Sequence, residues 1–154
     1  MMIVGISVTT AAIGKDETEG IKIPQNSTKD GQTFSPVNGK LKIYVKYARE
    51  LRDTDGPFNL PDPYVVVDAY DTRLHKNTRK TITINETLNP DWNEWLEFGK
   101  EDWLEFRIQL LDADKYWDDE MMPPDTVSIC QGNHKDQTYS SEDNGYLMYD
   151  YILE

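Results

Sequence analysis

The sequence has little cysteine, no long apolar run and few basic residues in its second half. Its single cysteine, Cys130, has no second cysteine to pair with, so an internal disulfide is excluded and a thiolate metal site is not expected. We therefore expect Cys130 to be a small buried apolar side chain. No stretch approaches the roughly 18 apolar residues that a membrane-spanning helix requires.

Basic residues are scarce where acidic residues are dense. Residues 1–100 carry 13 Lys and Arg against 14 Asp and Glu, whereas residues 101–154 carry 3 against 14. Nucleic acids bind to basic surfaces, so DNA and RNA are not expected as partners. The same imbalance favours a cation as the ligand of the acidic part.

The length of 154 residues, with 38% hydrophobic and 29% charged residues, is typical of one soluble globular domain. Glycine and proline recur between residues 14 and 39, which predicts an N-terminal arm or linker over residues 1–38. Its apolar start is either an extra strand or a degenerate signal sequence. The folded domain is predicted over residues 39–154.

The folded part has the pattern of β-strands. Apolar Leu41, Ile43 and Val45 alternate with lysines and a tyrosine, which puts one face of a strand in the core. Similar short segments, separated by turn residues and with no convincing amphipathic helix, predict an all-β, eight-stranded antiparallel β-sandwich. The strands are expected near residues 41–47, 64–70, 78–84, 92–98, 104–110, 126–130, 137–140 and 146–153.

The most informative stretch is Leu110–Glu120, which holds five carboxylates within nine residues directly after an alternating apolar segment. Such a cluster is either spread out in water or gathered around a cation. Calcium takes six to eight oxygen ligands, mostly carboxylates and carbonyls. An EF-hand is excluded, because Trp117 occupies its required glycine position and Pro123 its twelfth position.

Two other predicted loops carry acidic residues. Residues 52–63 follow the first strand, residues 87–91 precede the fourth, and the acidic stretch follows the fifth. If the first and fifth strands are neighbours, Asp55 and Asp62 converge on Asp112 and Asp114. The sequence therefore predicts a calcium site at one end of the sandwich, where function is usually carried by loops.

Three motifs together resemble the C2 domain, a calcium-dependent membrane-binding β-sandwich. They are Asp62-Pro63-Tyr64-Val65, Thr87 to Glu94, and Asp112-x-Asp114, and their order and spacing also match. The third loop, through Met121-Met122, is most similar to perforin-like C2 domains. The closing strand from Gly145-Tyr146 indicates type II topology, one of the two circular permutations of the fold.

The resemblance implies which residues bind calcium. Six residues separate Asp55 from Asp62 where the family usually has five, so either one residue bulges or Asp53 replaces Asp55. Glu120 stands where the family usually has aspartate. The implied calcium ligands are Asp55, Asp62, Asp112, Asp114, Asp118, Asp119 and Glu120.

The resemblance also implies a phospholipid membrane surface as partner. Phe58, Tyr116 and Trp117 lie beside the acidic residues and are expected to contact the bilayer, because aromatic rings favour its interface. Met121 and Met122 are expected in the core or at its rim. A basic patch is either a site for anionic lipid or a solvated hairpin whose charges discourage aggregation; it consists of Arg73, Lys76, Arg79 and Lys80.

The predicted function is a calcium-dependent phospholipid-binding module that acts as a peripheral membrane protein, either free-standing or within a parent polypeptide. The perforin resemblance favours a secreted protein, and a cytoplasmic one is the alternative. The competing function is a calcium-independent protein-interaction scaffold. An enzyme is not expected, because the sequence has no nucleophile paired with a base, no phosphate-binding glycine loop and no zinc spacing.

Overall fold

The computed structural model describes residues 27–29, 32–56, 59–114, 116–142 and 144–154. These residues form strands and no helix, so none of them lies in a helix long and apolar enough to cross a bilayer. The strands are β1 (Ser27–Lys29), β2 (Gln32–Phe34), β3 (Val37–Arg49), β4 (Pro63–Asp71), β5 (Lys76–Lys80), β6 (Asp91–Asp112), β7 (Asp119–Ser128), β8 (Gly132–Ser140) and β9 (Tyr146–Leu153).

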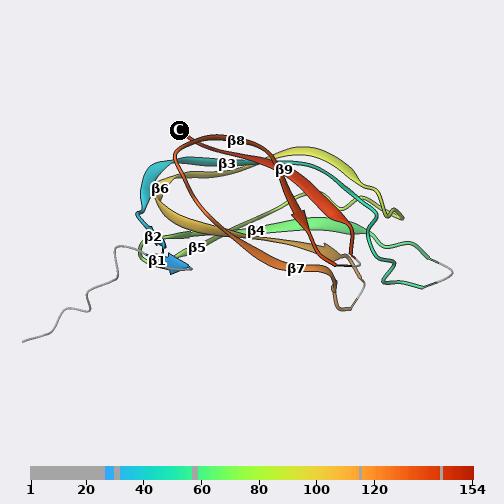
Figure 1. Cartoon of the computed structure of the whole chain (residues 1–154). Coiled ribbons are helices and arrows are strands. Elements are labelled where there is room, and N and C mark those ends of the chain that lie inside the picture. Colours follow the sequence, from blue (N-terminus) through green and yellow to red (C-terminus); the bar gives the residue numbers. More distant parts are fainter. Residues whose placement is uncertain (1–26, 30–31, 57–58, 115, 143) are drawn as a thin grey trace, which may run out of the picture.

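Strands β3 to β9 build two layers joined by β6 (Figure 1). The hydrogen-bonded order is β5-β4-β6-β3-β9-β8, with β7 also paired to β6, and every pairing is antiparallel. The first half of β6 pairs with β3, and the second half pairs with β4 and β7. The predicted antiparallel sandwich is confirmed, and counting the halves of β6 separately gives its eight strands.

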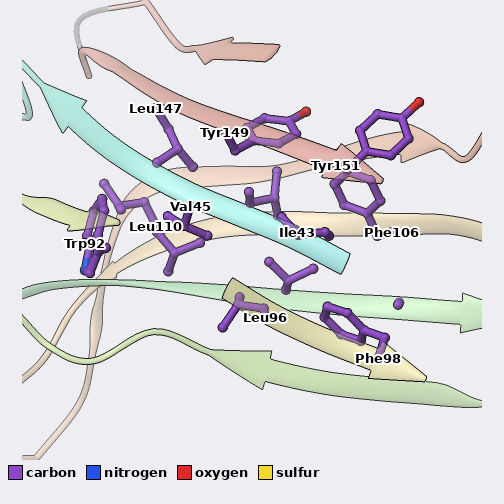
Figure 2. Close-up of a cluster of buried hydrophobic side chains, with 14 of the residues drawn as sticks. Ile43, Val45, Trp92, Leu96, Phe98, Phe106, Leu110, Leu147, Tyr149 and Tyr151 are labelled. Atoms are coloured by element: carbon purple, nitrogen blue, oxygen red, sulfur yellow. The ribbon is translucent and has the colours of Figure 1, made fainter. Parts of the chain in front are cut away.

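The core lies between the layers and follows from the alternating pattern of the strands. In β9, for example, Leu147, Tyr149, Tyr151 and Leu153 are buried and the residues between them are partly exposed. Figure 2 shows two of these tyrosines beside Phe106, whose ring lies 5.5 Å from that of Tyr151. The adjacent Met121 and Met122 of β7 are also buried, as the sequence predicts.

The strands predicted at residues 92–98 and 104–110 are one continuous strand, β6. Gly99 has a φ of 78°, a conformation that favours glycine, beside a bulge that shifts the register between β6 and β3. The pairing of β6 passes from β3 to β4 at Trp103, whose side chain turns into the core and whose indole N–H donates to the Gly39 carbonyl at 3.1 Å. The chain therefore changes layers within one strand.

Two local predictions were wrong. Strand β5 ends at Lys80 instead of residue 84, because Thr81 turns inward and its hydroxyl accepts the Val65 amide at 2.9 Å. Cys130 is exposed instead of buried, because the preceding Ile129 fills the core position and the next side chain points outward.

Much of the arm predicted over residues 1–38 lies outside the described residues, including all of its apolar start. Within the described part, β1 and β2 pair antiparallel as a short hairpin, and β3 begins at Val37. The last strand, β9, lies between β3, the first strand of the sandwich, and the edge strand β8, which agrees with the predicted type II topology.

The turn before β9 packs closely against the base of the first loop. Gly145 has a φ of 75°, and a Cβ there would overlap the Arg49 carbonyl oxygen and lie 2.5 Å from that of Glu50. At Gly99, with a φ of 78°, a Cβ would meet no atom within 4 Å. Both glycines therefore have a left-handed backbone conformation, but of the two only Gly145 has neighbouring atoms that a side chain would overlap.

We predict that Gly145→Ala lowers the free energy of unfolding by at least about 3 kcal/mol, from the left-handed backbone and the carbonyl overlap together. Gly99→Ala is the matched control and should cost only about 1–2 kcal/mol, from the backbone alone. Denaturant unfolding of both variants measures the difference, and equal losses would contradict the close packing at Gly145.

Candidate functional site

Three loops meet at one end of the sandwich, on the right of Figure 1. Loop one (residues 50–62) joins β3 to β4, loop two (residues 81–90) joins β5 to β6, and loop three (residues 113–118) joins β6 to β7. The antiparallel pairing of β4 with β6 places Pro63 opposite Asp112, so the end of loop one lies directly beside the start of loop three.

Backbone hydrogen bonds tie the three loops together. Loop one accepts from loop two, since the Thr87 amide donates to the Pro61 carbonyl at 2.9 Å. It also accepts from loop three, since the Ala113 amide donates to the Asp62 carbonyl at 3.0 Å. Because these bonds involve the backbone alone, the loops are held together whatever their side chains bind.

Asp55 of loop one, Asp112 at the end of β6 and Asp114 of loop three bring carboxylate oxygens within 4.8 Å of one another. We call these residues the carboxylate cluster. Asp112 is buried, with 1% exposure, Asp55 is half-buried and Asp114 is exposed. The cluster is therefore open to solvent on one side and anchored in the fold on the other.

The buried member is held by two donors from loop one. The Asp62 amide donates to Asp112 Oδ1 at 2.6 Å, and the Thr54 hydroxyl donates to Asp112 Oδ2. Both bonds fix the positions of the carboxylate oxygens. Asp112 is thus a fixed point around which the more exposed carboxylates are arranged.

Desolvation and mutual repulsion both act on the carboxylates of the cluster. Partial desolvation, followed by the charge of Asp112, raises the pKa of both Asp55 and Asp114 above the ordinary value. A carboxyl whose pKa is raised on folding favours the fold below its unfolded pKa and loses that contribution as the pH rises through its folded pKa. At neutral pH these two charges therefore oppose folding unless a cation neutralises them.

Asp62 lies next to Asp112 as predicted, but its backbone amide makes the contact instead of its carboxylate. Its carboxylate accepts the Glu86 amide of loop two at 2.7 Å, and it lies outside the carboxylate cluster. Asp53 likewise lies outside the cluster, and its Oδ1 accepts the amides of Asp55 and Gly56 at 3.2 and 3.1 Å. Asp53 closes a turn that carries Asp55 inward.

The remaining acidic residues predicted in loop three have other surroundings. Asp118 accepts the Tyr64 hydroxyl at 2.6 Å and the Asp114 amide at 3.2 Å. Glu120 accepts from the Gln109 amide group at 3.0 Å, and Asp119 begins β7 opposite Asp112. Burial and the Asp118 carboxylate raise the pKa of Tyr64 to about 12, so its hydroxyl remains a donor.

Large apolar side chains project from the loops. Tyr116 and Trp117 of loop three are 78% and 84% exposed, and Leu60 of loop one is 41% exposed. Phe58, the other aromatic residue predicted to contact the membrane, lies outside the described residues. The carboxylate cluster is therefore flanked by exposed apolar groups on two loops.

The predicted basic patch lies on the β4–β5 hairpin and on β5. Part of its charge is already neutralised, since Arg73 pairs with Asp71 at 2.7 Å and Lys76 with Asp68 at 3.4 Å. Arg79 and Lys80 are exposed on β5. Arg73 and Lys76 lie at the opposite end of β4 from the carboxylate cluster, whereas Lys80 directly precedes loop two and its Nζ lies 5.6 Å from the centre of the Tyr64 ring.

Sequence reasoning missed three residues of this end: Thr54, Leu60 and Tyr64. The role of Tyr64 has no local signal, because its partner Asp118 is far along the chain. Thr54 stands between two aspartates, where a hydroxyl able to donate to a carboxylate was a usable clue.

The donor set of the cluster fits a hard cation. It offers only carboxylate oxygens, with no thiolate or imidazole, and hard oxygen ligands suit calcium and magnesium. The half-exposed arrangement also leaves room for ligands from outside the protein. The residues present are therefore compatible with calcium.

Comparison with known proteins agrees with this geometry. The family model for the C2 domain matches residues 39–142. The chain is 42% identical over 69 residues to "Synaptotagmin-4" of Arabidopsis thaliana, covering 45% of this chain and 11% of the relative. It is 33% identical over 92 residues to "Protein C2-DOMAIN ABA-RELATED 11" of the same plant, covering 59% of this chain and 51% of the relative. The chain thus spans about half or less of these relatives.

Solved structures show the same fold. A single C2 domain of plant Extended Synaptotagmin 1 superposes with a TM-score of 0.62 at 23% identity, covering 77% of this chain and 95% of that one. The calcium-bound pair of C2 domains of Extended-Synaptotagmin 2 gives a TM-score of 0.58 at 21% identity, covering 77% and 46%. Human GIVD cytosolic phospholipase A2 gives 0.65 at 24% identity, but only 16% of that chain is covered.

The family model spans the strands that carry all three loops, from β3 through the whole of β7, and the superposed structures share the sandwich. The finer similarity to perforin-like domains stays a prediction. On the family match and the shared fold, this chain belongs to the C2 domain family.

Proposed function

We propose that this chain is a calcium-dependent membrane-binding module whose three loops form the binding end. The observation that carries the proposal is the carboxylate cluster of Asp55, Asp112 and Asp114, set beside the exposed Tyr116 and Trp117. The calcium-bound C2 domains of Extended-Synaptotagmin 2, which share this fold, support the proposal. Its location would be peripheral to a membrane; the predicted secreted setting and its cytoplasmic alternative both fit this geometry.

The carboxylate cluster would hold the ion, with the buried Asp112 as its fixed member. Bound calcium would neutralise the repulsion among these carboxylates and accept oxygen ligands from a lipid headgroup. Asp53 would act only through the turn that it closes, since its Oδ1 accepts the Asp55 and Gly56 amides. This arrangement favours Asp55 over Asp53 as the ligand from loop one.

The chain's own charge makes a cation necessary for binding to an anionic surface. The formal net charge is −12, and most of the excess lies in residues 101–154, which include loop three. Anionic lipid would be repelled by this end of the molecule without an ion. Trp117, at 84% exposure, would then add apolar contact at the interface, where tryptophan is favoured.

One observation favours the calcium-independent scaffold instead. The carboxylates of Asp62 and Glu120 are engaged by the Glu86 amide and by Gln109, which leaves fewer oxygens in the cluster than the resemblance implies. A scaffold of this kind would recognise a protein partner without metal. An enzyme is not proposed, and the similarity to a phospholipase covers only 16% of that chain.

A calcium titration by calorimetry tests the metal site. We predict that Asp55→Asn and Asp114→Asn each weaken calcium binding by at least about tenfold, because ligand charge sets affinity. Asp53→Asn is the matched control in the same loop, and it should stay within about threefold because its oxygen can still accept the turn amides. A larger loss for Asp53→Asn than for Asp55→Asn would reverse the assignment.

Thermal unfolding gives a second readout for the same variants. Calcium at roughly 100 times its dissociation constant should stabilise the wild type by about 2.7 kcal/mol, or roughly 5–10 °C. Asp55→Asn and Asp114→Asn should lose this shift, and each should be more stable than the wild type in chelator at neutral pH because a repulsive charge is gone. Wild-type protein that shows no shift at millimolar calcium would favour the scaffold.

Sedimentation with vesicles tests the membrane contact. We predict that Trp117→Ala weakens binding to anionic phospholipid vesicles in calcium by about tenfold, the value of one buried aromatic side chain. Trp95→Ala is the control, because Trp95 is 46% exposed on β6 and packs on Tyr44 away from the loops. Equal losses for the two variants, or equal pelleting with and without calcium, would argue against the proposal.

A further inference from the structure

Asp118 differs from its acidic neighbours in how its carboxylate is used. Each of its oxygens accepts a different donor, Oδ2 from the Tyr64 hydroxyl at 2.6 Å and Oδ1 from the Asp114 amide at 3.2 Å. Tyr64 is 7% exposed and belongs to β4, in the body of the sandwich. Asp118 therefore connects both ends of loop three to a rigid strand.

These two hydrogen bonds hold the two ends of loop three in place below its apex. The segment between Asp114 and Asp118 carries Tyr116 and Trp117, which are 78% and 84% exposed. A side chain as exposed as that of Trp117 gains little packing from the sandwich, so its direction depends on the backbone that carries it. That backbone is fixed at Asp114 and Asp118 by the same carboxylate.

We propose that Asp118 is a positioning residue and that, with Tyr64, it forms a latch that orients the aromatic tip of loop three before any ion binds. This assignment replaces the ligand role that the sequence resemblance implies for Asp118. It deepens the proposed function and rests on it, because the orientation of the tip matters only if the tip contacts a membrane. The latch itself is independent of calcium.

The latch makes vesicle binding and calcium affinity separable, whereas the two would change together if Asp118 were itself a calcium ligand. If Asp118 only positions the tip, removing the Tyr64 hydroxyl loosens loop three and leaves the carboxylate cluster intact. Vesicle binding would then weaken, because a loose tip must be ordered when it binds. Calcium affinity would change less, because Asp55 and Asp112 lie outside the latch and only Asp114 adjoins it.

The first experiment measures hydrogen exchange of the Asp114 amide by NMR in chelator. Tyr64→Phe and Asp118→Ala should each speed its exchange by about five- to tenfold, as expected for the loss of a hydrogen bond. Asp118→Asn should stay close to the wild type, because its carbonyl accepts the amide and its NH₂ donates to the Tyr64 oxygen. Tyr139→Phe is the control, because it also removes a tyrosine hydroxyl bond, to the Pro123 carbonyl, but one that does not involve Asp118.

The second experiment compares calcium affinity with vesicle binding at saturating calcium. Tyr64→Phe should keep its calcium affinity within about threefold and lose about two- to tenfold in binding to anionic vesicles. Tyr64→Phe combined with Asp118→Ala should lose no more vesicle binding than Asp118→Ala alone, because both changes open the same latch.

Two results would overturn the latch. One is an Asp114 amide whose exchange is unchanged in Tyr64→Phe and Asp118→Ala. The other is a calcium affinity that falls in Asp118→Asn as far as in Asp114→Asn and rises in Tyr64→Phe, which would make Asp118 a ligand held back by Tyr64. A wild type that binds neither calcium nor vesicles would refute the proposed function alone, because the exchange measurement needs no ion.

Discussion

The register between β4 and β6 is the constraint on which the functional end depends. It sets Pro63 opposite Asp112, so the last residues of loop one lie against the first residues of loop three. Carboxylates that repel one another are then held together by backbone hydrogen bonds and by the buried Asp112, which accepts the Asp62 amide. The stability of the sandwich is used to maintain an arrangement that the charges alone oppose.

The sequence could predict the fold and the place of the site because both depend on short-range patterns. Period-two alternation marks the strands, and the turn residues between them mark the loops. The close approach of Asp62 to Asp112 was therefore predictable from the motif order. Which atom of Asp62 makes that approach was not predictable, because the choice between its amide and its carboxylate depends on Glu86 in another loop.

The other differences between prediction and structure also arise from contacts and positions that short-range sequence patterns do not specify. The continuous β6 was predicted as two strands because polar residues and Gly99 interrupt its apolar alternation, although it keeps pairing with β3 through the bulge at this point. Cys130 was assigned to the core from its residue type, whereas its position after the buried Ile129 turns it outward. The resemblance placed Asp118 among the calcium ligands, and its hydrogen bond to the Tyr64 hydroxyl, far away in the sequence, could not be predicted from the local pattern.

The path of β6 also has a mechanical consequence. This 22-residue strand pairs with β3 in one layer and with β4 in the other, and both its first and its last residues lie at the loop end, so its bend lies at the opposite pole. Spreading the two layers at the loop end would therefore have to open this bend, because one backbone joins the layers there.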